Sequence, residues 1–323
     1  MTGSTVVITG VGLAVTGLPE DADQLSVDWI TPASGHALDL GGRHMRHKDR
    51  ASRLALRSVE RALIDAGLPT EPTDSFGRTA TVVSSNYGNL DSVCEFTGRI
   101  AEESTTALSP LGLPHVSSNA IAGWVAIRHR LNGPNVTLCN GRTSGLDALH
   151  WAATLIRAGR ADMAVVVGIE PDTEPVRRLL AIEPGKPLLD GAATLILEAA
   201  AFATNRRASV RAVVGSLSRT ASVAAALREL GESPGLWLTP PGLSGNEIPF
   251  PSIDLTQRFG ECSGALGLLQ GAAAVAHFDR GDPRPVHATC GGRPGGDVVT
   301  LSLHAPPTAA PRPDHEAIEP EKL

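Results

Sequence analysis

The chain has 323 residues, of which 42% are hydrophobic, so it can bury a large core as one large domain or two ordinary ones. Its net charge is −6 and only 3% of its residues are aromatic, which argues against a nucleic-acid binder, because such proteins carry a basic surface and stacking rings. No apolar run reaches the roughly 20 residues that span a bilayer. The four cysteines form no C-x-x-C pair, so we expect reduced thiols in a cytoplasmic protein without metal or cofactor (Cys94, Cys139, Cys262, Cys290).

The first two-thirds of the chain alternate predicted strands and helices, which is typical of an α/β protein. A β-branched strand at 5–13 precedes a stretch without clear period, 14–44, that we interpret as loop. Asp49 is placed to cap a helix over 50–66, and Gly67 follows where a left-handed residue often ends a helix. The remaining elements are, in order, strand 79–85, helix 90–103, a loop with Pro110 and Pro114, helix 119–131, strand 136–139, helix 144–158 and strands 163–168 and 194–199.

The last third continues in the same way and ends in a polar tail. Its predicted elements are strand 209–216, helix 223–230, strands 236–239 and 252–255, helix 264–277, and strands 286–290 and 298–303. Residues 306–323 carry four prolines and mixed charge, so we expect them to be disordered.

The sequence contains one internal repeat. Residues 141–158 (GRTSGLDALHWAATLIRA) match residues 260–277 (GECSGALGLLQGAAAVAH) at a constant offset, and both read Gly-x-x-Ser-Gly before an Ala/Leu-rich helix. Each segment predicts a strand, a tight turn and a helix that packs closely on a sheet. Two such elbows indicate a duplicated α/β unit, although two unrelated Ala-rich helices remain the alternative.

With these motifs in place, the chain up to about residue 305 resembles the β-ketoacyl synthases of the thiolase fold. The segment 45–68 (MRHKDRASRLALRSVERALIDAGL) is similar to that family's first long helix, and 133–137 (GPNVT) to the strand before its nucleophile. The segment 186–198 (KPLLDGAATLILE) resembles a trimmed family segment. The resemblance implies duplicated βαβαβ halves in five α-β-α-β-α layers. We expect an N-terminal half at 1–202 and a trimmed C-terminal half at 203–305.

The chain lacks the catalytic residues that this resemblance implies. Ketosynthases use an elbow cysteine, activated at a helix N-terminus, and two histidines that stabilise the developing enolate. Here the cysteine position falls on Arg142, and the histidine of the second elbow on Glu261. The other histidine should lie in the stretch 238–242, at Pro241. Residues 151–276 contain no histidine at all, so no shift of the alignment restores either one.

The two replacements carry opposite charges. In the family these positions face each other, so we expect Arg142 and Glu261 to form a buried ion pair that plugs the site; random decay of both positions is the alternative. The run Gly145-Leu146-Asp147-Ala148-Leu149 is similar to the helix start of chain-length factors, the catalytically silent partners of active ketosynthases. The resemblance therefore implies a heterodimer with a cysteine-bearing ketosynthase, transient contact with an acyl carrier protein, and no catalysis by this chain alone. Candidate tunnel or interface residues are Pro114, His115, Ser118, Trp124 and Cys139.

Two other classes of function stay open. One is a repurposed acyltransferase or hydrolase that uses Cys139, Ser144 or Cys262, although each of these residues also fits a purely structural role. The other is a homodimeric scaffold or carrier-docking protein without any ketosynthase partner. A stable 1:1 complex with a cysteine-bearing ketosynthase would separate them from the silent partner.

Overall fold

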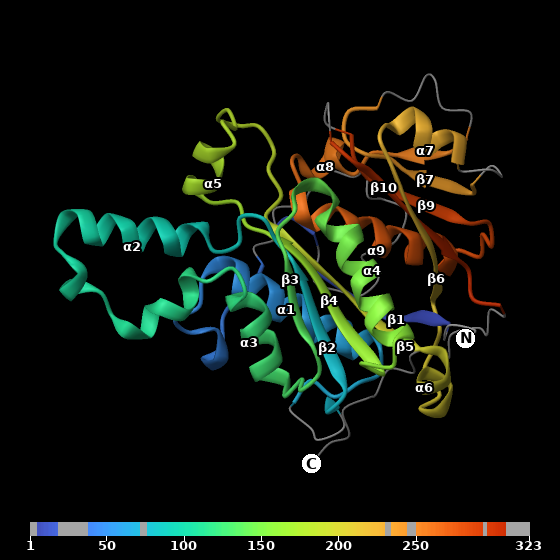
Figure 1. Cartoon of the computed structure of the whole chain (residues 1–323), viewed down its shortest axis with the longest axis horizontal. Coiled ribbons are helices and arrows are strands. Elements are labelled where there is room, and N and C mark those ends of the chain that lie inside the picture. Colours follow the sequence, from blue (N-terminus) through green and yellow to red (C-terminus); the bar gives the residue numbers. More distant parts are fainter. Residues whose placement is uncertain are drawn as a thin grey trace, which may run out of the picture.

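The computed structural model describes residues 5–18, 38–71, 76–229, 234–243, 250–292 and 296–307 (Figure 1). Its first half contains β1 (Val6–Val15), η2 (Arg43–Met45), α1 (Arg50–Asp65), β2 (Thr79–Ser84), α2 (Leu90–Glu102), η4 (Thr105–Ala107), η5 (Pro110–Val116), α3 (Ala120–His129), β3 (Asn135–Leu138), η6 (Gly141–Thr143), α4 (Ser144–Arg157), β4 (Met163–Glu170), α5 (Glu174–Leu179) and β5 (Gly191–Ala199). The second half contains α6 (Ala200–Asn205), β6 (Ala212–Thr220), α7 (Val223–Glu229), β7 (Leu236–Leu238), β8 (Ser252–Ile253), α8 (Thr256–Phe259), η8 (Ser263–Ala265), α9 (Leu266–Asp279), β9 (Val286–Gly291) and β10 (Val298–His304).

The strand order confirms the duplication. The sheet runs β3-β2-β4-β5-β1-β6-β10-β9-β7-β8, so the first five strands and the last five repeat one order when each half is counted from its own edge. The pairings repeat as well: β2 is parallel to β3 and β4 as β7 is to β8 and β9, and β5 and β10 are antiparallel to both of their neighbours. Only two residue pairs, Val7↔Val213 and Ile8↔Ala212, join β1 to β6.

The helices complete the five expected layers. Helices α4 and α9 lie side by side in the centre, and both contact strands of both halves (Figure 1). Helices α1 and α3 cover the outer face of the first half, and the short α7 packs on β6 and β10. One buried cluster fills the space around α4 and α9, and a second lies beneath α1 and α3. The central helices approach closely because glycines meet there, Gly145 of α4 against Gly267 of α9.

Local signals in the sequence placed most elements within a few residues. The Asp49 side chain caps α1 as expected, accepting the backbone N–H of Ser52 at 2.6 Å, and Gly67 has a φ of 66°. Residues 110–116, predicted as loop, instead form the 3₁₀ helix η5, because Pro110 occupies its first turn, where a missing N–H costs nothing. The sixth strand is shifted to Ala212–Thr220, because it pairs with β10 there.

Three expectations concern segment boundaries. The boundary at 202/203 falls inside α6, so the two halves are connected by a helix. Within the stretch 14–44, Ala14 and Val15 belong to β1 and residues 43–44 to η2, while 19–37 lie outside the described residues. Of the tail, only residues 306 and 307 are described. The connection between β4 and β5 holds the short helix α5, which no sequence pattern had indicated.

Candidate functional site: two facing elbows

The two repeated segments meet at the ends of the central helices. Each elbow begins at a glycine with positive φ, Gly141 at 85° and Gly260 at 73°, passes through a 3₁₀ turn, and continues as α4 or α9. Arg142 and Glu261 occupy corresponding positions and form an ion pair through Nη2 and Oε2. Their side chains are 25% and 17% exposed, so the pair is partly rather than fully buried. Glu261 Oε1 also accepts the backbone N–H of Ser263 at 2.9 Å.

Asn86, two residues after β2, ties the two elbows together. Its Nδ2 donates to the carbonyl oxygen of Gly141 at 3.0 Å and to Oγ of Ser263 at 2.8 Å. Its Oδ1 accepts the backbone N–H of Gly141 at 3.0 Å. One amide side chain therefore fixes the turn of the first elbow against that of the second.

Glu170, at the end of β4, is buried beneath this arrangement. Its Oε1 accepts the backbone N–H groups of Asn86 at 2.8 Å and Gly264 at 3.0 Å, and its Oε2 that of Tyr87 at 3.0 Å. Burial raises the pKa of Glu170 to about 8, against the opposing effect of these N–H donors, which favour the carboxylate. The carboxyl group thus holds the loop after β2 against the second elbow.

The candidate nucleophiles stand in unfavourable surroundings. Burial and nearby Glu170 raise the pKa of the Cys139 thiol, although the residue reaches the surface. Cys262 is fully buried, and its pKa is raised well above the ordinary value by burial and Glu261. Ser144 Oγ donates to Oδ1 of Asn140 at 2.5 Å, so its proton is directed at an amide and not at a base. Among the described residues no hydrogen bond joins the buried Ser144 to His150, which is exposed.

The remaining site candidates lie in two other places. Pro241 stands in the turn after β7, next to Gly242, whose N–H donates to Asp254 Oδ2 at 3.0 Å. Pro114 and His115 belong to η5, and Ser118 is exposed just before α3. Trp124 of α3 is half-buried, with the His115 ring 5.3 Å from it and Lys48 Nζ 4.0 Å above its ring centroid. His115, Trp124 and Lys48 therefore form a cluster near the start of α1, where His115 Nδ1 also lies 3.4 Å from Asp49 Oδ2.

Two residues important to the site escaped the sequence analysis, Asn86 and Glu170. Asn86 lies two residues after β2 and Glu170 is the last residue of β4, and the carboxyl ends of these parallel strands share one edge of the sheet. A carboxylate closing a fully apolar strand such as 163–170 is an unusual buried polar group, and that was the available signal.

Comparisons with known proteins agree with this geometry. Residues 36–183 match the family model of the β-ketoacyl synthase N-terminal domain. The chain is 29% identical over 143 residues to 3-oxoacyl-[acyl-carrier-protein] synthase 2 of Rhizobium meliloti (strain 1021), covering 44% of this chain and 32% of that protein. It is 28% identical over 147 residues to the tetracenomycin polyketide synthase ketoacyl synthase beta subunit of Streptomyces glaucescens, covering 43% and 34%. The chain thus matches about a third of the length of these two curated relatives.

Solved structures match over nearly the whole chain. The ishigamide ketosynthase/chain length factor superposes with a TM-score of 0.71 at 24% identity, over 93% of this chain and 99% of that one. A type II polyketide synthase acyl-carrier protein in complex with its ketosynthase gives 0.76 at 18% identity, over 94% and 100%. The duplicated sheet and facing elbows define a protein of the thiolase fold. Within that fold, the chain is similar to the ketosynthases, whose N-terminal domain model matches residues 36–183.

Proposed function

We propose that this chain is a non-catalytic ketosynthase-like subunit of the chain-length-factor type. It pairs with a cysteine-bearing ketosynthase in type II polyketide, polyene or fatty-acyl biosynthesis, and it shapes the acyl tunnel of that partner. The observation that carries the proposal is the ion pair of Arg142 and Glu261 at the two elbow turns. An arginine that is committed to a carboxylate supplies no nucleophile, and a carboxylate that is committed to an arginine does not replace a histidine as hydrogen-bond donor.

The outer edge of β3 supports a protein partner. Strand β3 ends the sheet and pairs only with β2 among the described strands, so its other side presents backbone N–H and C=O groups. Exposed apolar side chains flank it on both faces: Ile127 of α3 is 70% exposed and Trp151 of α4 is 48% exposed. An edge strand between two apolar residues fits a partner that continues the sheet.

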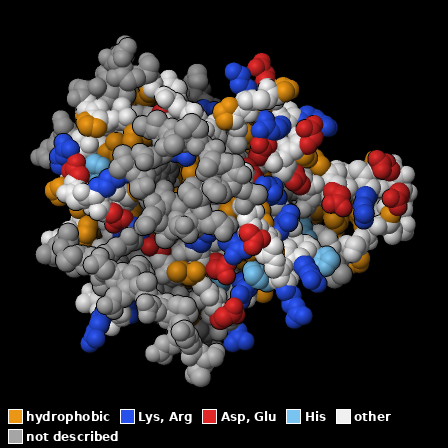
Figure 2. Space-filling model, turned by 180° about the vertical axis from the view of Figure 1, so that it is seen from behind, with side chains coloured by type: hydrophobic (Ala, Val, Ile, Leu, Met, Phe, Trp, Pro, Cys, Tyr) orange, Lys and Arg blue, Asp and Glu red, His pale blue; other side chains and the backbone are white. Residues whose placement is uncertain are grey.

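A projecting arm extends the same side of the molecule. Helix α2 has no buried residue, and together with η4 and η5 it stands away from the body (Figures 1 and 2). Leu113 in η5 is 52% exposed and Ile100 in α2 is 43% exposed. An arm with apolar residues and no core of its own is expected to gain contacts from a partner subunit. Pro114, His115 and Ser118 lie on or beside this arm and remain our candidates for tunnel and interface contacts.

Co-expression tests the proposal directly. The chain is produced alone and together with a candidate cysteine-bearing ketosynthase, and both samples are analysed for mass and for condensation of acyl groups on an acyl carrier protein. We expect a 1:1 complex whose activity is abolished by Cys→Ala at the partner's nucleophile and retained with Cys139→Ala and Ser144→Ala in this chain. If the chain alone transfers acyl groups and loses this activity in Cys139→Ala or Ser144→Ala, it is an enzyme. If it forms a homodimer that does not bind the ketosynthase, it is a scaffold.

A further inference from the structure

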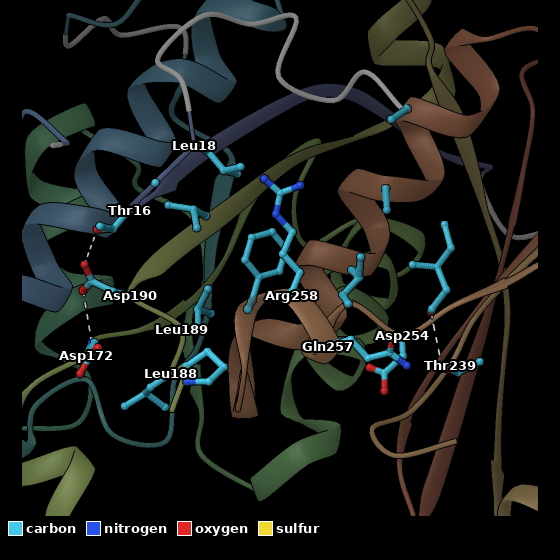
Figure 3. Close-up of a pocket in the computed structure, with 18 of the residues that line it drawn as sticks. Thr16, Leu18, Asp172, Leu188, Leu189, Asp190, Thr239, Asp254, Gln257 and Arg258 are labelled. Atoms are coloured by element: carbon cyan, nitrogen blue, oxygen red, sulfur yellow. Dashed lines mark hydrogen bonds between the residues drawn. The ribbon is translucent and has the colours of Figure 1, made fainter. Parts of the chain in front are cut away.

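A large cavity lies beside the second elbow. Its volume is about 1060 Å³, and it opens between the end of β1, the start of β5 and the α8–α9 corner (Figure 3). This is close to the upper end of the range found for small-molecule sites, roughly 300–1,000 Å³. The N–H of Leu189, which lines the cavity, donates to the carbonyl oxygen of Glu261 at 3.2 Å. Neither Arg142 nor Glu261 lines the cavity, so it is a separate site from the ion pair.

The walls of the cavity are mostly apolar and come from both halves of the fold. From the first half come Val15, Leu18 and Leu189; from the second half come Leu255, Phe259 and Ala273. Figure 3 shows Leu188 and Leu189 on the side of the first half, facing the α8 segment across the opening. Burial against such walls stabilises an aliphatic ligand chain in proportion to the apolar area that it removes from water.

The acidic side chains at the cavity are engaged within the protein. Asp190 accepts Nε of Arg50 at 2.6 Å, and Asp172 holds Arg177 in a two-point ion pair. Asp254 accepts two backbone N–H groups, at 2.9 and 3.0 Å. These carboxylates are therefore not free to bind a ligand cation.

The basic side chains at the cavity are engaged as well. Arg50 is paired with Asp190, and both Arg258 and Arg280 have interaction partners within the chain. The guanidinium carbon of Arg258 also lies 5.3 Å from the ring centroid of Phe259. Each charged side chain among the described lining residues therefore has a partner in the protein. A charged ligand would lose its hydration on entry without gaining a free counter-charge, which favours an uncharged ligand.

One polar side chain at the cavity, the amide of Gln257, has no such partner. Gln257 lines the cavity from α8, and its side chain forms no hydrogen bond within the part of the chain that the structure describes. Its backbone N–H donates to the carbonyl oxygen of Asp254 at 3.3 Å, and Figure 3 shows both residues on the side of the second half. A primary amide carries N–H donors and a carbonyl acceptor, so it can exchange two hydrogen bonds with a second amide.

We propose that this cavity is a binding site for an uncharged aliphatic amide, with the hydrocarbon chain against Leu255 and Phe259 and the amide group on Gln257. An amide head group suits the cavity because it matches both the donors and the acceptor of Gln257 and brings no charge. The site does not depend on the silent-partner function, since the cavity is formed by this chain alone.

Calorimetric titration of the full chain with octanamide tests the site. We expect saturable 1:1 binding, with octanoate and octylamine each at least about tenfold weaker, because both are charged near neutral pH and find no free counter-charge. Butanamide should also be at least about tenfold weaker, because its shorter chain buries less apolar area.

Two substitutions at the cavity separate the amide contact from the space. Gln257→Met keeps the size of the side chain but removes its hydrogen-bonding groups, so it should weaken octanamide by about fivefold or more. Ile253→Trp narrows the opening from a 41% exposed position and should weaken octanamide and butanamide alike.

Matched substitutions away from the cavity provide the controls. Asn205→Leu removes an exposed amide at the end of α6, Ile64→Trp enlarges an exposed isoleucine of α1, and neither residue lines the cavity. Both variants should bind octanamide like the parent chain. The proposal is overturned if octanamide does not bind, if octanoate or octylamine binds equally well, or if Gln257→Met has the same affinity as Asn205→Leu. Equal affinities of Ile253→Trp and Ile64→Trp would likewise overturn it.

Discussion

At the scale of single residues, the site is defined by two opposite charges that are largely removed from water. Arg142 and Glu261 are three-quarters or more buried, and each provides the counter-charge of the other. A charge left alone at such a depth loses solvation that nothing replaces, whereas two apolar residues of similar size are tolerated. The sequence indicated the pair through the repeat, because 119 residues separate the two positions, as they do the two elbows.

A double-mutant cycle tests this coupling. We expect Arg142→Met to lower the free energy of unfolding by about 1–3 kcal/mol, and Glu261→Leu by a similar amount, because each leaves one partly buried charge unpaired. The double variant should recover much of the loss, because no charge remains. Urea denaturation of all four proteins measures the cycle. Strictly additive losses would show that the two residues do not interact.

Glu170 gives the molecule a pH dependence with a defined sign. Its pKa is about 8 in the folded protein against an ordinary value of 4.5, so the folded state holds the proton more tightly than the unfolded state. The contribution to stability is complete below pH 4.5 and is lost as the pH rises toward 8. His129 acts in the opposite direction, because burial lowers its pKa from 6.5 to about 4, so stability from that residue is lost as the pH falls below 6.5.

The range from pH 7.5 to 8.5 isolates Glu170 from His129 and from His44, His277 and His287, whose pKa values burial also lowers, because the unfolded-state value of 6.5 lies a full unit below it. There we expect the free energy of unfolding to fall with rising pH by up to about 1.4 kcal/mol per unit, and Glu170→Gln to flatten this slope. The measurement is urea denaturation at half-unit pH steps. Glu183→Gln, at an exposed position, should leave the slope as it is. A slope that survives in Glu170→Gln would assign the effect to another group.

At the scale of elements, local sequence signals predicted the strands and helices, but they did not predict the contacts between them. The Asp49 cap and the apolar run at 163–168 are properties of neighbouring residues, and they located α1 and β4 closely. Helices α5 and α6 are six residues each, too short to show a period. Strand β6 was misplaced by three to four residues because its extent depends on pairing with β10, which lies about eighty residues further along the chain.

The contact of α4 with α9 makes a sharp prediction about glycines. A Cβ at Gly267 would meet the backbone N of Leu146 and the carbonyl carbon of Gly145, neither of which can rotate away. We expect Gly267→Ala to cost about 1–3 kcal/mol of stability, as overpacked sites do. Gly123→Ala, in α3 with nothing within 4 Å of the added atom, should be neutral or stabilising by up to about 1 kcal/mol. Thermal and urea denaturation compare the two, and equal effects would contradict the close approach.

At the scale of the whole molecule, the two ends of the sheet differ. The β3 end carries the exposed Ile127 and Trp151 and lies near the projecting arm, whereas the β8 end borders the cavity. A partner that continues the sheet is therefore expected at β3. The described residues include no helix long and apolar enough to cross a bilayer.

Substitution at each end tests which one is the interface. Trp151→Asp and Ile127→Asp should weaken the complex with the partner ketosynthase by tenfold or more, because an unpaired charge would enter the interface core. Ile253→Asp, on the opposite edge strand, should leave the affinity unchanged. Analytical ultracentrifugation of the co-purified subunits gives the dissociation constants. Loss of the complex in Ile253→Asp alone would move the interface to the β8 end.

The sequence by itself determined the α/β class and the duplicated elbows, because the alternation of elements and the repeat are local or periodic patterns. Its resemblance to ketosynthases marked positions 142 and 261. Only the tertiary structure decided what those residues contact. Glu170 accepts hydrogen bonds from Asn86, which is 84 residues away along the chain, and from Gly264, which is 94 residues away. The walls of the cavity likewise come from both halves. Such contacts arise where chain segments pack together, and neither propensity nor spacing encodes them.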